Sequence, residues 1–495
     1  MKKGIVLLAT TVALLSLFSG AHTTVWYVHP DSALSSIQAG LDSCSTDDTV
    51  LVAAGTYYEN LTWPSTQGID LVSEFGADTT VIDGSGATYV IGIGTGVHST
   101  TTVSGFTIMN GYGYEAGGIH CLSSSPTITG NTVTMNTADY GGAIECDMGS
   151  SPIITGNTIT GNTGYSGGIE CWRNSSPTIT GNAITGNVAY LAGGIACYDT
   201  SSPTIAGNTI NGNTAEWGGG IACYTGCSPE IRGNDISGNT ADSSGGGIDL
   251  YANSSPTIVG NMITANTAAL GAGIACQNDC SPIIDSCTVS GNTAMVGGGI
   301  SCHDNSNPSI DSCTISGNSG DGVTCGNASS PEIHWCEIVD NTGYGVQNVD
   351  SSVTVDAESN WWGCELGPSG VGPGTGDEVS EWVDYDPWLT GFGVTETVSP
   401  TSPTQFILFQ NYPNPFACMT NIHWSLPTSC HTILRIYNVS GQLVRTLVDE
   451  YQRSGNYTAC WDGKDNSAQR GVQGVYFYRL ESGNFTSIKK MILLQ

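Results

Sequence analysis

Positive charge is the first thing that this 495-residue sequence lacks. It has 12 Lys and Arg against 43 Asp and Glu, a formal net charge of −31 at pH 7, and no lysine between Lys3 and Lys464. Residues 22–404 hold only Arg173 and Arg232 beside 38 acidic residues, whereas residues 405–495 hold eight basic and five acidic ones. Such a surface repels nucleic acid, and it repels anionic polysaccharide unless calcium bridges the contact.

Long hydrophobic runs are also absent, except at the N-terminus. MKKGIVLLATTVALLSLFSGA has two lysines, an apolar core and small residues at a cleavage site, which predicts a secretory signal peptide over residues 1–21. No later segment is apolar enough to cross a bilayer, so we expect no transmembrane segment. The predicted location is secreted or at the outer cell surface.

What the sequence does contain is a repeat with a spacing of 23 to 27 residues. Each unit has a proline, an asparagine ten residues later and, in most units, the motif Gly-Ile-x-Cys near its end. The first six units carry another asparagine five residues after the proline, where the last three carry cysteine. The nine prolines are Pro126, Pro152, Pro177, Pro203, Pro229, Pro256, Pro282, Pro308 and Pro331.

Apolar runs in these units are three to five residues long and are bounded by Gly, Asn or Pro, which excludes helices and predicts three short strands per unit. One unit cannot bury its apolar faces alone, but stacked units can, at about 4.8 Å per coil. Stacking also aligns the asparagines into ladders whose amides pair with turn backbone. For the second unit we predict strands at Ile153–Thr155, Thr158–Thr160 and Gly168–Cys171, with Ile154, Ile159, Ile169 and Cys171 pointing inward.

The predicted fold class is therefore all-β, a right-handed parallel β-helix solenoid over residues 22–392 followed by a small β-sandwich. Regular coils are expected at 124–349 and a closing segment at 350–392. Apolar residues at helical spacing predict an N-terminal capping helix near 32–44, formed around Ala33, Leu34, Ile37, Leu41 and Cys44.

These repeats resemble the parallel β-helix repeat family of pectin-lyase-like folds. The resemblance extends to the lead-in DTVLVAAGTYYENLTW (48–63) and to ESNWWGCELGPSG (358–370), and it spans roughly residues 25–390. It implies the fold. It does not imply an activity, since the fold is shared by lyases, hydrolases, epimerases and non-enzymatic binders.

The last part of the chain has a different character. A Thr-, Ser- and Pro-rich linker is expected at 393–404 and an immunoglobulin-like domain at 405–495. The motifs FQNYPNPF (409–416), LRIYNVSGQLVRTL (434–447), WDGKD (461–465) and GVYFYRL (474–480) resemble the C-terminal sorting domain of the type IX secretion system. They are also similar to the module of flagellar hook-assembly proteins. The resemblance implies export, with the secretion machinery as partner. An ordinary immunoglobulin-like spacer is the alternative.

The 18 cysteines do not form an obvious disulfide framework. Eight of them share one inward site of the repeat, where Leu250 stands in one unit, so the site suits a small apolar filler. Parallel Cβ atoms in neighbouring coils favour buried free thiols over disulfides, and nothing like paired CxxC predicts a metal site. Cys418, Cys430 and Cys460 could form one disulfide with one thiol left over.

Candidate functional residues lie on and beside the Gly-Ile-x-Cys strand. The positions expected to face outward include His120, Glu145, Glu170 and Asp249, with the first three on adjacent coils. Two aromatic rows border this strand. The candidate carbohydrate-binding residues are His120, Asp147, Trp172, Tyr198 and Tyr224 on and after the strand, and Tyr140, Tyr165, Tyr190 and Trp217 before it, in a row that begins at Tyr114.

Sugars stack on aromatic rings and form hydrogen bonds to carboxylates, so we expect a long groove that binds extracellular polysaccharide. The protein would then bind polysaccharide or act as a surface adhesin. The alternative is that the aromatics merely cover coil edges and the acids keep the face soluble. A Thr-x-Thr array of the ice-binding type is interrupted too often to favour that function. A spacer role also stays open.

Catalysis is a further alternative. A close carboxylate pair such as Glu145 and Glu170 suits glycoside hydrolysis, because neighbouring acids raise one pKa, and Arg173 is a nearby basic residue of the kind that lyases use. The candidate catalytic residues are therefore Glu145, Glu170 and Arg173. No metal ligands and no certain cofactor are predicted, and calcium is the ion left open.

Overall fold

The computed structural model describes residues 23–390 and, in the C-terminal part, residues 395–397, 406–411, 414–416, 420–453, 455–466, 469–483 and 485–494. The predicted signal peptide at 1–21 lies outside the described residues, and so does most of the expected linker at 393–404. Part of that linker differs from the prediction. Residues Thr395–Thr397 form strand β48, which pairs antiparallel with β53 (Gly455–Trp461).

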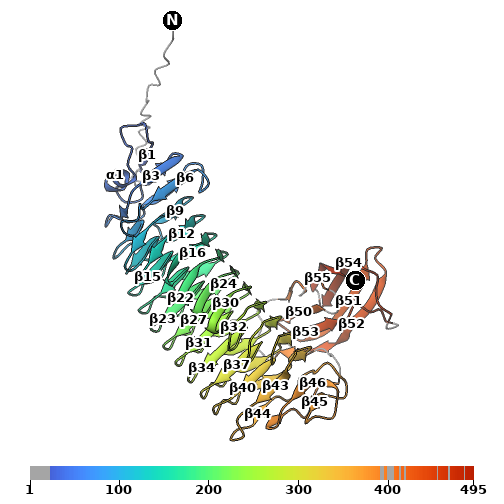
Figure 1. The fold of residues 1–495 in the computed structure, drawn as a ribbon. Coiled ribbons are helices and arrows are strands. Elements are labelled where there is room, and N and C mark those ends of the chain that lie inside the picture. Colours follow the sequence, from blue (N-terminus) through green and yellow to red (C-terminus); the bar gives the residue numbers. More distant parts are fainter. Residues whose placement is uncertain are drawn as a thin grey trace.

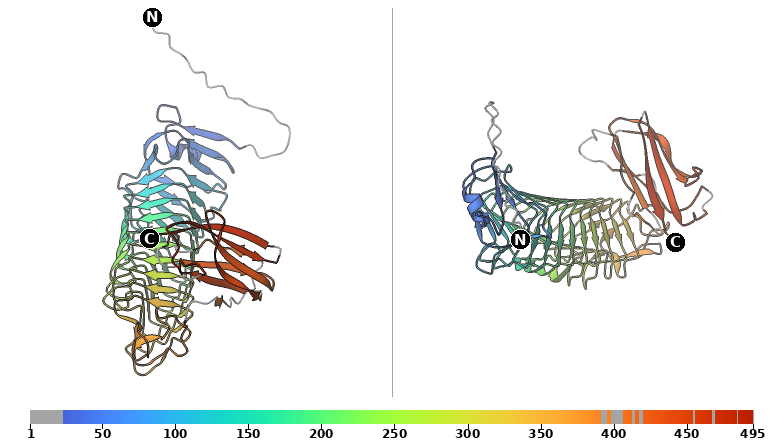
Figure 2. Two further views of the ribbon diagram at one scale, coloured as in Figure 1. Left: turned by 90° about the vertical axis from the view of Figure 1, so that its right-hand side faces the viewer. Right: turned by 90° about the horizontal axis from the view of Figure 1, so that it is seen from above.

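The larger part of the chain is a parallel β-helix, as predicted (Figure 1). Three long parallel sheets run along it. Sheet A has fifteen strands from β1 (Val25–Val28) to β47 (Val383–Asp384), and sheet B has twelve from β3 (Gly55–Tyr58) to β42 (Glu337–Val339). Sheet C has fourteen, from β4 (Leu61–Thr62) to β46 (Gly376–Val379) and β45 (Pro368–Gly370). Two further views show the coils in single file (Figure 2).

One coil shows how the repeat folds. It consists of β16 (Ile153–Thr155) in sheet A, β17 (Thr158–Thr160) in sheet B, β18 (Thr163–Ser166) and β19 (Ile169–Cys171) in sheet C. Three of these strands agree with the prediction, and β18 is additional. The predicted inward residues Ile154, Ile159, Ile169 and Cys171 are all fully buried. Each stacks on its counterpart in the next coil, as Ile154 does on Ile179, so the core is a set of apolar columns.

The prolines lie in one file at the start of sheet A and are buried. The proline carbonyls accept hydrogen bonds from backbone amides of the next coil. For example, the Ile153 amide donates to the Pro126 carbonyl at 2.9 Å. The file of nine prolines along one edge confirms the stacking that the repeat predicts.

Asparagine ladders hold the turns. The Asn187 amide nitrogen donates to the carbonyl of Ile159 and to Oδ1 of Asn213, both at 3.0 Å, while its own oxygen accepts from Asn162 on the coil before. This ladder runs unbroken from Asn136 to Asn341. The second ladder passes from asparagine to cysteine at Cys287, whose sulfur accepts from the Asn261 backbone amide at 3.5 Å. A third ladder was not predicted, although its serines stand two residues before most of the repeat prolines; its hydroxyls, such as those of Ser150 and Ser175, accept from backbone amides of the coil before.

The cysteine column lies inside sheet C. Cys121, Cys146 and their counterparts are fully buried, and every cysteine among the described residues is free, Cys430 and Cys460 included. Cys418 lies outside the described residues. Burial raises the pKa of the Cys121 thiol, which keeps this side chain neutral and apolar-like.

A short helix covers the first coil. Helix α1 (Ile37–Asp42) falls within the predicted range 32–44 and packs against β1, β2 (Thr49–Val52) and β4. Its Ile37 and Leu41 are fully buried. The Glu59 carboxylate accepts from the amides of Ile37 and Gln38 at 2.8 and 2.9 Å, which satisfies donors that a helix start leaves free.

The C-terminal domain is a sandwich of two four-stranded antiparallel sheets. One contains β49 (Ile407–Leu408) and β50 (Thr420–Leu426) with β48 and β53. The other contains β51 (Cys430–Asn438), β52 (Leu443–Gln452), β54 (Gly474–Ser482) and β55 (Phe485–Leu493). Between them lies a separate core around Trp424, Trp461 and Tyr478, all fully buried. No helix in the described part of the chain is long and apolar enough to cross a membrane.

The ladder generates a stability prediction. Asn187→Ala removes the side-chain bonds above and leaves buried backbone groups unpaired, so we expect the free energy of unfolding to fall by about 3 kcal/mol. Asn211→Ala is the matched control. The Asn211 side chain is exposed, and its amide nitrogen donates a hydrogen bond to Ser237 Oγ at 2.9 Å. It should cost less than about 0.5 kcal/mol. Urea unfolding midpoints measure both, and equal losses in the two variants would contradict the ladder's role.

Candidate functional site: an aromatic pocket over buried carboxyl groups

A fourth, short sheet changes the environment of the candidate residues. Sheet D follows sheet B and precedes sheet C in six successive coils and contains β10 (Tyr112–Gly113), β14 (Thr137–Ala138), β18, β22 (Val188–Ala192), β26 (Thr214–Trp217) and β30 (Thr240–Ser244). The chain then turns through glycines into sheet C and covers its outer face. The residues expected to be exposed there are buried, with His120 at 4%, Glu145 at 0% and Glu170 at 2% exposure. These side chains are therefore not exposed as expected, and the alternative in which the acids keep this face soluble is wrong.

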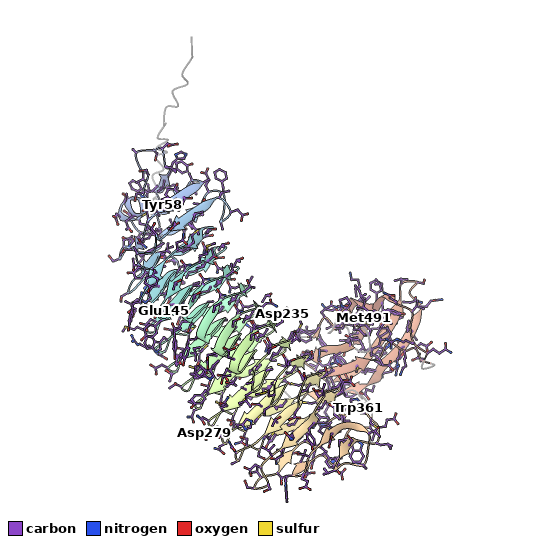
Figure 3. The ribbon with its side chains drawn as sticks, in the orientation of Figure 1. Tyr58, Glu145, Asp235, Asp279, Trp361 and Met491 are labelled. Carbon is purple, nitrogen blue, oxygen red and sulfur yellow. The ribbon has the colours of Figure 1, made fainter. Side chains whose placement is uncertain are left out.

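The two glutamates lie side by side, as the repeat predicts. β11 (Ile119–Leu122), β15 (Ile144–Asp147) and β19 pair so that His120, Glu145 and Glu170 are in register (Figure 3 labels Glu145). Gly141 packs over both acids. A Cβ at that position would lie 2.9 Å from Glu145 Cβ and 3.3 Å from Glu170 Oε2, so the cover requires glycine.

Burial determines the charge of this row. It raises the pKa of Glu145 to about 9, with a smaller contribution from Glu170, and it raises the pKa of Glu170 to about 8. Burial also lowers the pKa of His120. At neutral pH His120, Glu145 and Glu170 are therefore uncharged, whereas the sequence suggested one ionised and one protonated glutamate.

Arg173 does not lie free beside the glutamates. Its guanidinium stacks on the Trp172 ring at 3.9 Å from the ring centre, and its Nη1 lies 3.2 Å from Oδ2 of the buried Asp147. A guanidinium stays protonated and here is held by a carboxylate, so Arg173 is not suited to be a general base.

The two aromatic rows meet instead of standing apart as the walls of a long groove. Tyr140 stacks on Trp172 with ring centres 5.5 Å apart, and the hydroxyls of Tyr165 and Tyr198 lie 3.4 Å apart. Farther along, Leu191, Ala192, Ala196 and Ala222 fill the space between sheets D and C with a small apolar cluster. Tyr190, Trp217 and Tyr224 pack along this closed part of the rows.

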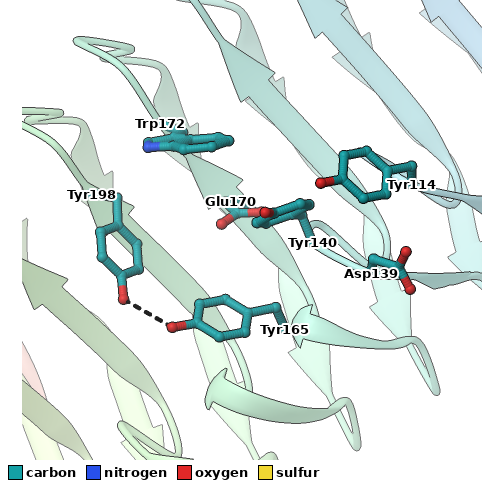
Figure 4. Close-up of a pocket in the computed structure, with 7 residues that line it drawn as sticks. All are labelled: Tyr114, Asp139, Tyr140, Tyr165, Glu170, Trp172 and Tyr198. Carbon is teal, nitrogen blue, oxygen red and sulfur yellow. Dashed lines mark hydrogen bonds between the residues drawn. The ribbon is translucent and has the colours of Figure 1, made fainter.

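Where the row carries glutamate instead of alanine, space remains. A pocket of about 430 Å³ opens there, lined by Tyr114, Asp139, Tyr140, Tyr165, Glu170, Trp172 and Tyr198 (Figure 4). Five of the seven are aromatic, and Glu170 contributes a carboxyl group to the wall. The structure thus brings together Tyr140, Tyr165, Trp172 and Tyr198 of the predicted residues. It leaves the buried His120, Glu145 and Asp147 off the pocket wall.

The exposed Asp139 is a lining residue that the sequence analysis missed. Its position directly before Tyr140 in the aromatic row was the available signal. A second feature was also missed, since no metal ligands were predicted. One potential ligand atom from each of His120, Glu145 and Asp147 lies within 4.8 Å of the other two.

The buried acid farther along the row gives a pH prediction. Asp249 on β31 (Ile248–Tyr251) accepts from the Tyr224 hydroxyl and, at 2.9 Å, from Ser244 Oγ, and burial raises its pKa to about 6. An unfolded aspartate has a pKa of about 3.9. Between these values the folded state keeps a proton that the unfolded chain has released, so stability falls as pH rises and stays lower above about pH 6.

Asp249→Asn removes this group, so the difference in unfolding free energy between wild type and variant should change by about 3 kcal/mol from about pH 4 to about pH 7. The variant should gain relative to wild type as pH rises. Urea unfolding at a series of pH values measures the difference. A difference that is independent of pH would show that Asp249 ionises normally in the fold.

Comparisons with solved structures find low similarity. Latent dimeric PorU from Porphyromonas gingivalis is 22% identical over 20% of this chain and 10% of that chain, with a TM-score of 0.16. A periplasmic alginate epimerase is 14% identical over 69% of this chain and 77% of that one, with a TM-score of 0.37. The A-module of a mannuronan C-5 epimerase from Azotobacter vinelandii is 13% identical over 72% and 94%, with a TM-score of 0.34. No curated protein matches the chain in sequence.

Family models match both parts of the chain. The model described as right handed beta helix region matches residues 91–261 and 194–361, which together exceed half of the chain, and the model for a secretion system C-terminal sorting domain matches residues 410–494. The chain therefore belongs to the right-handed parallel β-helix family and carries a C-terminal sorting domain of the type IX secretion system.

Proposed function

We propose that this protein is exported through its sorting domain and binds a neutral polysaccharide at the aromatic pocket around Glu170. The sorting domain implies export and a secreted or outer-surface location. The observation that carries the binding proposal is the pocket of about 430 Å³, which is lined by five aromatic rings and by Glu170 and Asp139.

The pocket has the surfaces that a sugar needs. Sugar rings present apolar C–H faces, which pack on aromatic rings, and hydroxyls, which need partners at the edge of the contact. Trp172, Tyr140 and Tyr165 are half-buried, so each offers ring surface to a ligand while it is held by its neighbours. The hydroxyls of Tyr165 and Tyr198 and the acid of Glu170 supply polar groups among the rings. Apolar walls with a few convergent polar groups are typical of ligand sites.

Charge selects the class of glycan. Arg173 and Arg232 are the only basic residues between positions 22 and 404, and both are paired with carboxylates, Asp147 and Glu230. The rest of the solenoid is strongly acidic. A uronate or sulfated chain would be repelled at long range and would find no free cation at the pocket, so a neutral glycan is the favoured ligand.

Glycoside hydrolysis is the second candidate, because Glu170 lies in the pocket wall. Such hydrolysis needs two carboxyl groups on either side of the scissile bond. Glu145 is fully buried beneath Gly141 and does not line the pocket, so it does not provide the second group. Asp139 at the pocket lining is the remaining acid that a hydrolytic mechanism could use.

Trp172→Ala tests the binding proposal. Loss of this ring should weaken binding of the preferred neutral glycan about tenfold, or about 1.4 kcal/mol, while Trp172→Phe should retain most of the affinity. Tyr58→Ala is the matched control, since Tyr58 is 72% exposed on sheet B, far from the pocket (Figure 3). A glycan array on the full chain, followed by titration of the best ligand, gives the affinities.

The same samples separate binding from hydrolysis. Reducing ends should not increase on incubation of the wild-type protein with a bound glycan. Turnover that is abolished by both Glu170→Gln and Asp139→Asn would establish the hydrolytic candidate instead. Equal glycan affinity of wild type and Trp172→Ala would exclude the pocket as the binding site.

A further inference from the structure

The geometry points to a second site beneath the aromatic layer, in which His120, Glu145 and Asp147 bind one divalent transition-metal ion of the zinc type. This site is distinct from the glycan pocket, and the inference does not depend on it. It lies next to the pocket, because Glu145 is in register with the pocket residue Glu170 of the next coil, but none of its three residues lines the pocket.

The three side chains converge because of strand register. His120 on β11 pairs with Glu145 on β15, and Asp147 follows Glu145 by two residues, so both acids point to the same side of sheet C. Their ligand atoms all lie within 4.8 Å of one another. Ligand atoms around a tetrahedral zinc at about 2.0–2.2 Å lie roughly 3.3 Å apart, so modest side-chain rotations suffice to complete the site.

Polar atoms of two of the three side chains are buried without hydrogen-bond partners. Within the described structure, neither His120 Nε2 nor either carboxyl oxygen of Glu145 has a partner. Both residues are more than nine-tenths buried, at 4% and 0% exposure. Leaving a buried polar atom unpaired is costly, so three such atoms on two adjacent side chains favour a ligand at this place over a packed core.

The surrounding contacts orient the ligands. His120 Nδ1 lies 3.5 Å from Oε2 of Glu115, so Nε2 is the ring nitrogen left for a ligand, and such a carboxylate–histidine contact is typical of metal sites. Asp147 is held in place by the Met148 amide at 2.7 Å and by Arg173 at 3.2 Å. Arg173 and Glu115 therefore act as positioning residues.

The donor set selects the ion. One imidazole nitrogen and two carboxylates suit zinc and its neighbours in the first transition series, whereas calcium and magnesium favour oxygen ligands throughout. The cysteine column cannot contribute, because Cys121 and Cys146 point to the opposite, inner face of the same strands. The ion expected here therefore differs from calcium, the ion that the sequence left open.

Titration of the chelator-treated full chain with Zn²⁺, Co²⁺, Mn²⁺ and Ca²⁺ tests the proposal. We expect one equivalent of Zn²⁺ to bind by calorimetry and to raise the unfolding temperature, and Ca²⁺ to do neither. His120→Asn and Glu145→Gln should each weaken Zn²⁺ binding roughly 100-fold. The matched control is Asp249→Asn, a buried acid in the same row whose partners are Tyr224 and Ser244, and it should bind Zn²⁺ like wild type.

Co²⁺ spectroscopy distinguishes this site from the 18 cysteines. The wild-type complex should show weak visible bands of nitrogen and oxygen ligation, without the intense near-ultraviolet band of a thiolate ligand. A thiolate band, no Zn²⁺ binding by the folded wild type, or undiminished binding in folded His120→Asn and Glu145→Gln would each overturn the proposal. If a variant does not fold, the wild-type spectrum and stoichiometry still decide the question.

Discussion

Residue-on-residue register between successive coils is the constraint on which the rest of this structure depends. Parallel strand pairing places each inward isoleucine on the isoleucine of the next coil, as Ile154 lies on Ile179. The same register places Asn162 on Asn187, so their amides pair with each other and with turn carbonyls that would otherwise be buried unpaired. The polar ladders and the apolar columns therefore support each other, because neither can form unless the other is aligned.

On the outer face of sheet C, a second layer of strands packs on the stacked coils. Sheet D covers the face, and the residue underneath determines whether the two layers close. Ala196 and Ala222 allow Leu191 and Ala192 to fill the space as a small apolar cluster. His120, Glu145 and Glu170 occupy the same row toward the N-terminal end, where the layers enclose a pocket and a buried polar cluster. The pocket and the polar cluster therefore lie where the sequence departs from the regular repeat.

Export and architecture are consistent with a role outside the cell. The solenoid carries almost all of the negative charge, while the sorting domain is slightly basic and folds around its own core. The exposed surface discourages contact with polyanions, and the half-buried rings near Glu170 provide an apolar contact surface that does not depend on charge.

The sequence alone determined the repeat spacing, the inward residues, the asparagine ladders and the adjacency of His120, Glu145 and Glu170, because all of these follow from local periodicity and register. It did not predict β18 and the other strands of sheet D. Thr163–Ser166 has neither an apolar run nor alternation, and it becomes a strand only by pairing with its neighbours. Only the tertiary structure decided that this layer folds over the outer face of sheet C. That packing buries the carboxyl groups, raises their pKa values and brings the aromatic rows together, since burial depends on where a loop lies in space and not on the residues that it contains.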